Sequence, residues 1–395
     1  MKVLIISHLY PSVMNPSYGV FVHEQVKELK KQGCEVAVIS PVKYSPFPLN
    51  LINRKWRDLS DIPMKEEIDG ITVYHPRYPS LPKNILFEQT GQFMYACIHK
   101  LVTKLHLQEK FDLIHAHVAL PDGYAAYKLS ELLRCPYVLT IHGQDFQKTI
   151  YYNDMCKKRI ETALLHAKKV ILVSTKLENL LNKASFRGKI DYTIIPNGVD
   201  LEKIDNSNRK ANFKTKGPKL LSVSNLYKEK AIDINLKAVN LLREKHPKLE
   251  YIIVGDGPER DNLENLAKDL GLKDHVRFLG AFNHENVLEI MKECDVFSMP
   301  STNEAFGVVY IEAMAQGKPV IGCKGEGPQD IIKDRENGFL IDKNDVEQLS
   351  SIIDFLFSNN SLRNEIGEKG IKTVEEKFRW NVVAEKLIKE YKKFI

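Results

Sequence analysis

The chain has 395 residues, of which 43% are hydrophobic and 27% are charged, so it holds enough apolar material for the cores of two domains. Its six cysteines are scattered without a C-x-x-C pair, which argues against a zinc site or a disulfide framework and fits a reducing cytoplasm. No apolar run approaches the roughly 18 residues of a membrane span.

The basic excess lies in the first half of the chain. Residues 1–200 hold 26 Lys/Arg against 19 Asp/Glu, whereas the remainder holds 31 against 32. Random surface variation and an anionic partner, such as a membrane surface or a phosphorylated acceptor, explain this asymmetry equally well. Nucleic acid is not expected as a partner, since no nucleic-acid-binding motif or basic-aromatic repeat is present.

Strands and helices are expected to alternate along the first half. The N-terminal run lacks the long apolar region and cleavage site of a signal peptide, so it predicts the first strand. The strands expected here are Lys2–Ser7, Glu35–Ser40, Ile71–His75, Asp112–His115, Tyr137–Ile141, Lys169–Ser174 and Tyr192–Ile195. The helices expected between them are Val20–Lys31, Ile85–His106, Gly123–Leu133 and Met155–His166.

The second half repeats this alternation. Its expected strands are Lys219–Val223, Tyr251–Val254, Val276–Leu279, Val296–Met299, Pro319–Gly322 and Phe339–Ile341. Its expected helices are Ala231–Lys245, Glu259–Leu270, Glu285–Lys292, Gly307–Gln316, Val346–Phe357, Leu362–Glu376 and Trp380–Phe394. Apolar strands alternating with helices predict parallel sheets covered on both faces, here as two doubly wound α/β domains.

A polar segment without periodicity, 201–217, is expected to link the two domains. We therefore expect an N-terminal domain over 1–200 and a C-terminal domain over 218–379. The last helix, about 380–395, exceeds what the second sheet needs and is expected to pack back on the first domain. Because ligands of parallel sheets bind beyond the carboxyl ends of the strands, functional residues should lie just after strands.

The segment Val296–Val320 carries the most informative pattern. A helix expected over Gly307–Gln316 follows a strand and a polar loop, and its free N–H groups and positive dipole end suit a diphosphate. Glu304 and Glu312 would repel phosphate but would accept hydrogen bonds from the hydroxyls of a sugar and a ribose. On spacing alone, the more common explanation is that Glu304 complements the helix dipole and Glu312 is solvated.

The surrounding residues favour the ligand-binding explanation. Residues 304–321, EAFGVVYIEAMAQGKPVI, closely resemble the E-x7-E region of the family 4 retaining glycosyltransferases, which have the GT-B fold. Other segments that resemble motifs of this family follow in the same order: Asp112–His117, Thr140–Asp145, Pro196–Asp200, Val254–Glu259 and Val276–Gly280. The resemblance spans most of the chain and implies two Rossmann-like domains that face each other across a cleft.

The resemblance implies a role for each matched residue of the second half. Glu304 would contact hydroxyls of the donor sugar, and Glu312 would hold the nucleotide ribose. The backbone N–H groups of Phe306, Gly307 and Val308 would receive the diphosphate.

Three further positions complete the expected donor site. His142 would reach the donor sugar or its phosphate, with a buried structural histidine as the alternative. Lys230 would neutralise the diphosphate, with a solvated lysine at a helix start as the alternative. Gly255, in the segment that resembles the family's V-G-x-G-P turn, is also expected to contact the donor.

Two positions depart from the family pattern. Asn225 stands where the family usually has an arginine, and it can hydrogen-bond a phosphate but cannot neutralise it, so Lys228 is the candidate for the missing charge. The first loop has Ser17-Tyr18-Gly19 where the family often has paired glycines. Gly19 can still approach the donor phosphates or the acceptor, while Tyr18 either narrows the acceptor pocket or belongs to an ordinary turn.

Together these residues predict a retaining hexosyltransferase that moves a sugar from a nucleotide-diphosphate donor to a hydroxyl acceptor. Lys230 and the helix N-terminus would stabilise the departing phosphate. No metal is expected, since no D-x-D follows a strand, and no cofactor beyond the nucleotide-sugar co-substrate. A nucleotide-sugar epimerase or hydrolase of the same fold and a non-catalytic two-lobe sugar-binding protein are the alternatives; a nicotinamide oxidoreductase lacks its G-x-G-x-x-G.

The acceptor is expected to be a sugar or a lipid-linked molecule in cell-surface polysaccharide or glycolipid assembly. The segment Leu49–Arg57 mixes apolar residues with Trp56 and three cations, which fits either an interfacial segment or a solvated loop. We therefore expect a cytoplasmic protein, with peripheral contact of its basic first domain at the inner face of the membrane.

Overall fold

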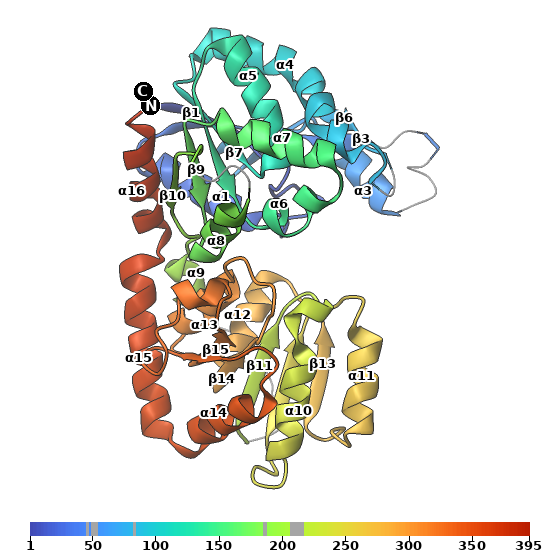
Figure 1. Ribbon diagram of the computed structural model, residues 1–395, viewed down its shortest axis with the longest axis vertical. Helices are drawn as coiled ribbons and strands as arrows, with labels where there is room; N and C mark the ends of the chain where they lie inside the picture. The colour runs from blue at the N-terminus through green and yellow to red at the C-terminus, as the bar shows by residue number, and fades with distance from the viewer. Residues whose placement is uncertain (45–46, 49–53, 82–83, 185–187, 206–216) are drawn as a thin grey trace. The chain divides into compact units, whose positions relative to one another are not determined.

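The computed structural model describes residues 1–44, 47–48, 54–81, 84–184, 188–205 and 217–395. The chain divides into two compact units, Met1–Asn197 with Trp380–Ile395, and Gly198–Arg379. Each unit is built on one mainly parallel sheet with helices on its two faces (Figure 1). The prediction of two doubly wound α/β domains is therefore confirmed.

The first unit contains, within the described residues, an eight-stranded sheet in the order β10-β9-β8-β7-β1-β2-β5-β4. Its strands are β1 (Lys2–Ile6), β2 (Glu35–Ile39), β4 (Lys65–Ile68), β5 (Ile71–Tyr74), β7 (Leu113–His117), β8 (Tyr137–Ile141), β9 (Lys169–Leu172) and β10 (Tyr192–Ile194). A separate parallel pair consists of β3 (Val42–Tyr44) and β6 (Arg77–Pro79). Its helical segments are α1 (Val20–Lys31), α3 (Arg54–Asp61), η2 (Phe87–Gln89), α4 (Thr90–Glu109), η3 (Ala119–Gly123), α5 (Tyr124–Leu133), α6 (Gln144–Gln147), η4 (Thr149–Tyr151), α7 (Asp154–Leu165), α8 (Thr175–Lys183) and α16 (Trp380–Tyr391).

The second unit contains, over its described part, a six-stranded parallel sheet in the order β13-β12-β11-β14-β15-β16. Its strands are β11 (Lys219–Val223), β12 (Glu250–Val254), β13 (Val276–Gly280), β14 (Val296–Ser298), β15 (Val320–Cys323) and β16 (Phe339–Ile341). Its helical segments are α9 (Leu201–Asp205), η5 (Lys228–Lys230), α10 (Ile232–Leu242), α11 (Arg260–Asp269), α12 (His284–Lys292), α13 (Val308–Ala315), η6 (Gly327–Asp330), α14 (Val346–Ser358) and α15 (Asn360–Lys377).

Three expectations about the backbone need correction. The first sheet is not wholly parallel, because β4 pairs antiparallel with β5. The turn between them, Asp69-Gly70, has positive φ at both residues (49° and 70°), as a type I′ hairpin turn requires. The expected linker begins with the helix α9, while its residues 206–216 lie outside the described residues. The helix α8 was not predicted; the side chain of Ser174, expected in a strand, accepts a hydrogen bond at its N-terminus.

The helix α16 packs against α1 in the first unit. Val3 and Ile5 lie two residues apart in β1 and therefore point to the same face of the sheet. They share one core with Val26 of α1 and Leu387 of α16. Each such side chain, when fully buried, contributes about 1.5–3 kcal/mol. The apolar face of α16 therefore fixes the end of the chain to the unit that contains its beginning.

Each sheet has a point where its strand order reverses. In the first unit this point lies between β1 and β7, and in the second between β11 and β14. Loops that leave two neighbouring strands in opposite directions open a crevice at the carboxyl ends of those strands, where parallel sheets bind ligands. These two switch points are the places to look for functional side chains.

Candidate active site

The switch point of the second unit holds an ion pair between two of the predicted residues. Lys230 ends η5, which follows β11, and Glu304 lies in the loop that follows β14. Lys230 Nζ lies 2.6 Å from Glu304 Oε2, and the two side chains are 23% and 13% exposed. The two residues, 74 positions apart in the sequence, therefore form one partly exposed site.

The backbone of Glu304 is fixed by a residue that the sequence did not single out. Its N–H donates to Glu326 Oε2 at 2.9 Å, and its carbonyl accepts the N–H of Gly327 at 2.9 Å. The Glu326 side chain is 2% exposed and its other oxygen bonds to Lys343 Nζ. A buried carboxylate with a cationic partner thus holds the loop that carries Glu304.

The N-terminus of α13 adjoins this loop. Gly307 precedes the helix with φ of 91°, and a Cβ there would lie 2.6 Å from Tyr310 Cδ2, so the backbone turn depends on glycine. Phe306 is buried against the ring of Phe378, at a centroid distance of 5.9 Å. The N–H groups of Val308 and Val309, the first two of α13, have no intrahelical acceptor and give this end partial positive charge, whereas the N–H of Tyr310 donates to Gly307 O at 3.0 Å.

Glu312 lies on α13, almost buried, and is engaged by a second residue that sequence reasoning missed. Its Oε1 lies 2.7 Å from Nε2 of His284, the first residue of α12. The His284 side chain is 40% exposed. No spacing rule could have shown this contact, since it depends on how α12 packs against α13.

The two remaining residues predicted in the second unit lie at the ends of neighbouring strands. Asn225 is exposed after β11, and its carbonyl accepts the N–H of Tyr227 at 2.9 Å. Gly255 follows β12 with φ of 133°, and a Cβ there would come within 1.8 Å of Ser224 O. Close backbone packing therefore accounts for the glycine at 255, whether or not a ligand is bound.

Gly19 of the first unit supports the loop that follows β1. It precedes α1 with φ of 67°, and a Cβ would lie 2.3 Å from the carbonyl carbon of Leu9. The start of α1 thus packs directly on the backbone of that loop. Tyr18 beside it is 42% exposed.

His142, which follows β8, lies in a group of stacked histidines. Its Nε2 is 3.0 Å from Nδ1 of His117, with the two rings nearly parallel, and the ring of Phe21 covers it at 4.8 Å. Its Nδ1 is buried and has no hydrogen-bond partner within the described structure. Burial lowers the pKa of His142 to about 3, so the ring is neutral at physiological pH.

The histidine group continues toward the last helix. His115 bonds through Nε2 to Thr140 at 2.7 Å and through Nδ1 to the hydroxyl of Tyr391 at 2.6 Å. Burial lowers the pKa of His115 to about 3, and it lowers the pKa of His117 well below its usual value. Neutral rings in an apolar setting hydrogen-bond without carrying charge, so this group is suited to orientation rather than to binding an anion.

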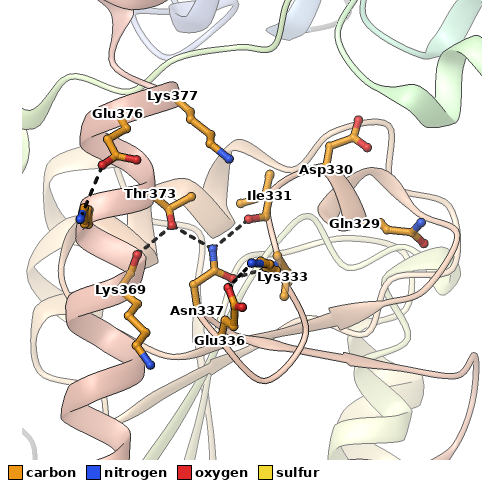
Figure 2. A pocket seen from close by; sticks show the side chains of 12 residues that line it. Gln329, Asp330, Ile331, Lys333, Glu336, Asn337, Lys369, Thr373, Glu376 and Lys377 are labelled. Atoms are coloured by element: carbon orange, nitrogen blue, oxygen red, sulfur yellow. Dashed lines mark hydrogen bonds and ion pairs between the residues drawn. The ribbon is translucent and has the colours of Figure 1, made fainter.

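A cavity of about 650 Å³ in the second unit lies between the loop after η6 and α15 (Figure 2). Asn337 crosses its floor, donating to Ile331 O at 3.2 Å and to Thr373 Oγ1 at 3.0 Å. Lys333 at its edge is paired with Glu336 at 2.7 Å. The described residues that line this cavity include none of those predicted for the donor site.

The described residues hold neither a metal cluster nor a membrane-spanning helix. They contain no three His, Cys, Asp or Glu side chains arranged to hold a metal ion. They also contain no helix that is both long and apolar enough to cross a membrane. Most of the Leu49–Arg57 segment, residues 49–53, lies outside the described part of the chain.

Two family models of known proteins match this chain, one in each half. The family model described as Glycosyltransferase Family 4 matches residues 19–203, and that described as Glycosyl transferases group 1 matches residues 203–373. TuaC of Bacillus subtilis, named as a candidate glycosyltransferase of teichuronic acid biosynthesis, is 30% identical over 99% of this chain and 98% of its own. The N-acetyl-alpha-D-glucosaminyl L-malate synthase of Bacillus anthracis is 27% identical over 99% of this chain and 96% of its own.

Solved structures resemble the whole chain. Sucrose-phosphate synthase from Thermosynechococcus elongatus has a TM-score of 0.78 at 20% identity, covering 100% of this chain and 98% of its own. HepE of Anabaena, in complex with UDP, has a TM-score of 0.73 at 19% identity over 100% of both chains. The same protein is also similar when solved with UDP-glucose, at a TM-score of 0.72 and 19% identity over 100% of both chains. At these identities the likeness shows the fold.

Proposed function

Because the chain belongs to family 4 of the glycosyltransferases (glycosyl transferases group 1) and has the GT-B fold, we propose that it transfers a sugar from a nucleotide-diphosphate donor to a hydroxyl acceptor. HepE, which has this fold, was solved with UDP and with UDP-glucose, which supports a donor of this chemical class. The donor diphosphate would bind the second unit at the switch point between β11 and β14.

The Lys230–Glu304 pair is the observation that carries this proposal. It joins a cation and a carboxylate beside the N-terminus of α13, where a sugar diphosphate needs both positive charge and hydroxyl acceptors. In the ligand-free chain Glu304 neutralises Lys230. On binding, a phosphate oxygen would replace Glu304 on Lys230, and the released carboxylate would accept a hydrogen bond from a sugar hydroxyl.

The other residues would complete the donor site. The N–H groups of Phe306, Gly307 and Val308 would bind the diphosphate. Glu312 would exchange its contact with His284 for one with the ribose. Asn225 would donate a hydrogen bond to a phosphate.

Gly19, Gly255 and His142 would contribute to donor binding by shape and orientation. The two glycines would let the backbone approach the donor, and the neutral His142 would orient a hydroxyl or a phosphate oxygen. His142 Nε2 is bonded to His117, so the contact of His142 with the donor would require another edge of its ring.

In the reaction, the bond between the sugar C1 and the diphosphate oxygen would break while the acceptor oxygen bonds to C1 from the same face, which retains the anomeric configuration. Lys230 and the α13 N-terminus would stabilise the negative charge on the departing diphosphate. We propose that these groups act without a metal ion and without a cofactor other than the nucleotide-sugar.

We further propose that the acceptor is a sugar or lipid-linked molecule of cell-surface polysaccharide or glycolipid assembly. The name of TuaC refers to teichuronic acid biosynthesis, which supports an acceptor of this kind. The basic excess of residues 1–200 would favour peripheral contact of a cytoplasmic protein with an anionic membrane surface.

A thermal-shift screen with UDP-, GDP- and ADP-sugars tests this proposal. A donor present at about 100 times its Kd should stabilise the fold by about 2.7 kcal/mol, which is read as a rise in Tm. The stabilising nucleotide-sugar should then yield transferred sugar when acceptor is present. Failure of every nucleotide-sugar to raise Tm would contradict the proposal, and free sugar formed equally fast with and without acceptor would favour a hydrolase.

A further inference from the structure

We propose that a small cavity at the amino-terminal edge of the first sheet binds an amphipathic anion, in which one carboxylate or phosphate group is joined to a short apolar chain. Lys110 and Arg134 would hold the anionic head, with His106 as a third hydrogen-bond donor, and an apolar wall would hold the chain. This site lies apart from the proposed donor site, so the inference goes beyond the proposed function and does not depend on it.

The cavity has a volume of about 360 Å³ and lies where two helices end and two strands begin. The helices α4 and α5 pack against each other and are followed along the chain by β7 and β8. His142, predicted for the donor site, comes after the carboxyl end of β8, at the opposite edge of the same sheet. The volume falls within the range of small-molecule pockets, about 300–1,000 Å³.

One side of the cavity is apolar. Its wall is formed by Leu107, Phe111, Leu133, Cys135 and Pro136. Phe111 is buried, whereas Leu107, in the last turn of α4, is 76% exposed. Burial raises the pKa of the Cys135 thiol to about 12, and the thiol donates to the carbonyl of Phe111 at 3.4 Å, so this sulfur is neutral. An apolar chain in the cavity would take Leu107 out of water, which is favourable.

The other side of the cavity carries three hydrogen-bond donors. The N–H of Phe111 donates to His106 Nδ1 at 3.2 Å, so the neutral ring of His106 carries its proton on Nε2. That Nε2 and the charged groups of Lys110 and Arg134 have no hydrogen-bond or ion-pair partner within the part of the chain that the structure describes. Two cations without a carboxylate partner, beside an apolar wall, suit an anion that also carries an apolar group.

The carboxylate among the described lining residues is engaged elsewhere. Asp112 Oδ2 accepts the backbone N–H of Lys2, at the start of β1, at 2.7 Å. With His106 neutral, Lys110 and Arg134 contribute two positive charges and Asp112 one negative charge, which leaves the lining with a net charge of +1. An anionic ligand would therefore meet net positive charge.

The backbone at the two cations adds a second observation. Lys110 follows α4 with φ of 51°, and Arg134 follows α5 with φ of 52°. Glycine and asparagine adopt this left-handed conformation most readily at the end of a helix. A cation near a helix C-terminus also gains from the helix dipole, but that gain is available in the last turn without a positive φ. A shared ligand accounts for cations in this position on two adjacent helices.

The larger cavity of the second unit offers no such set of donors (Figure 2). Three of the lysines that line it are paired with glutamates: Lys333 with Glu336 at 2.7 Å, Lys369 with Glu365 at 2.6 Å, and Lys372 with Glu376 at 3.9 Å. An anion would have to displace these carboxylates. The cavity beside α4 and α5 therefore has the clearer preference for an anion, although it is smaller.

Titration calorimetry of the full chain with octanoate and with octyl phosphate, both below the concentration at which they form micelles, tests this inference. Acetate and inorganic phosphate supply the head without the chain, and 1-octanol supplies the chain without the head. At least one of the two amphipathic anions should bind more tightly than all three controls, and the tighter of the two identifies the preferred head group. Methyl resonances of Leu107 and Leu133 should shift during that titration, which locates the site.

Lys110→Asn and Arg134→Asn remove one charge each, and asparagine tolerates the positive φ. Each variant should weaken binding of the amphipathic anion by about 3–10-fold. Arg335→Asn is the matched control, because Arg335 also has a positive φ (64°) and is 82% exposed but does not line this cavity. Leu107→Gln should also weaken binding, whereas Leu132→Gln should not, since Leu132 is exposed at the end of α5 outside the lining.

Three results would overturn the inference: no binding of either amphipathic anion, binding of 1-octanol as tight as that of the anions, or unchanged affinity in both Lys110→Asn and Arg134→Asn. The rise in Tm produced by a nucleotide-sugar should be the same in these variants as in the wild type. Failure of this site and failure of the proposed donor site can therefore be told apart.

Discussion

The switch point of the second unit and the histidine group of the first unit have opposite chemistry. In the second unit, Lys230 and Glu304 meet as charged groups that remain partly open to solvent. In the first unit, His115 and His117 are buried and His142 beside them is half-buried, and all three rings are neutral because burial lowers their pKa values. The comparison shows that local burial decides whether ionisable side chains at the ends of the strands stay charged or become neutral.

This difference fits a division of the reaction between the units. A diphosphate carries charge that must be matched, which requires ionised partners with access to ligand. A hydroxyl nucleophile carries none and must instead be oriented, which neutral hydrogen-bonding side chains such as these imidazoles can do. The predictions below test whether the two regions differ in this way.

The largest effect is expected from breaking the charged pair. Lys230→Ala and Glu304→Ala should each lower kcat by at least about 10³-fold, because in the proposed site the first would remove the cation on the leaving diphosphate and the second a contact with the sugar. The measurement is transfer from the donor identified by the thermal-shift screen, with circular dichroism to verify folding.

Lys237→Ala is the matched control for this pair. Lys237 also makes an ion pair in the second unit, with Asp233 at 2.8 Å, but both side chains are about two-fifths exposed, at 43% and 39%. Such a surface pair contributes about 0–1 kcal/mol to stability and should not affect transfer. Near-normal activity of both Lys230→Ala and Glu304→Ala would remove the basis of the donor site.

A smaller loss is expected when the support of Glu304 is removed. Glu326→Ala leaves the Glu304 N–H without its acceptor and should lower kcat by roughly 10–100-fold through misplacement of the loop. Glu326→Gln keeps an acceptor oxygen and should recover most of the activity. If the glutamine and alanine variants were equally impaired, the charge of Glu326, not its hydrogen bond, would be what matters.

The smallest effect concerns the pH dependence of stability in the first unit. His142 has a folded pKa of about 3, below the value of roughly 6.5 in an unfolded chain, so the unfolded chain takes up this proton first. Its contribution to stability is therefore complete above about pH 6.5 and is lost as the pH falls toward 3.

His142→Gln removes this titration. Between about pH 6 and pH 4 the free energy of unfolding of the variant should fall less steeply than that of the wild type, by about 1.4 kcal/mol per pH unit. Urea unfolding across this range measures the slope. Parallel curves would mean that His142 is protonated in the folded chain and that the first unit is not the neutral region described above.

Much of the fold could be predicted because its signals are local. The bounds of α1, β8, β11 and β16 coincide with those expected from apolar periodicity. The helix α8 was missed because its sequence, TKLENLLNK, spans only nine residues and follows the expected strand Lys169–Ser174 without a break. The antiparallel β4, with the sequence KEEI, has no apolar pattern, so the Asp69-Gly70 turn that follows it is its only signal in the sequence.

The sequence indicates individual residues of the candidate site but not the contacts between them. The motif from Glu304 to Glu312 located the loop and helix, but their partners Glu326 and His284 come from other strands and helices. The contact between His8 and Asp122, at 2.6 Å, likewise joins residues 114 positions apart. Such pairs depend on strand order, which a single sequence does not encode locally, so only the assembled sheets reveal them.

The most direct test of the account is a crystal structure of the chain with the nucleotide-sugar that raises its Tm. The diphosphate should lie within hydrogen-bonding distance of Lys230 Nζ and of the N–H groups at the start of α13. Glu304 should have left its 2.6 Å contact with Lys230 and turned to a sugar hydroxyl. A diphosphate bound elsewhere, with the Lys230–Glu304 pair intact, would contradict it.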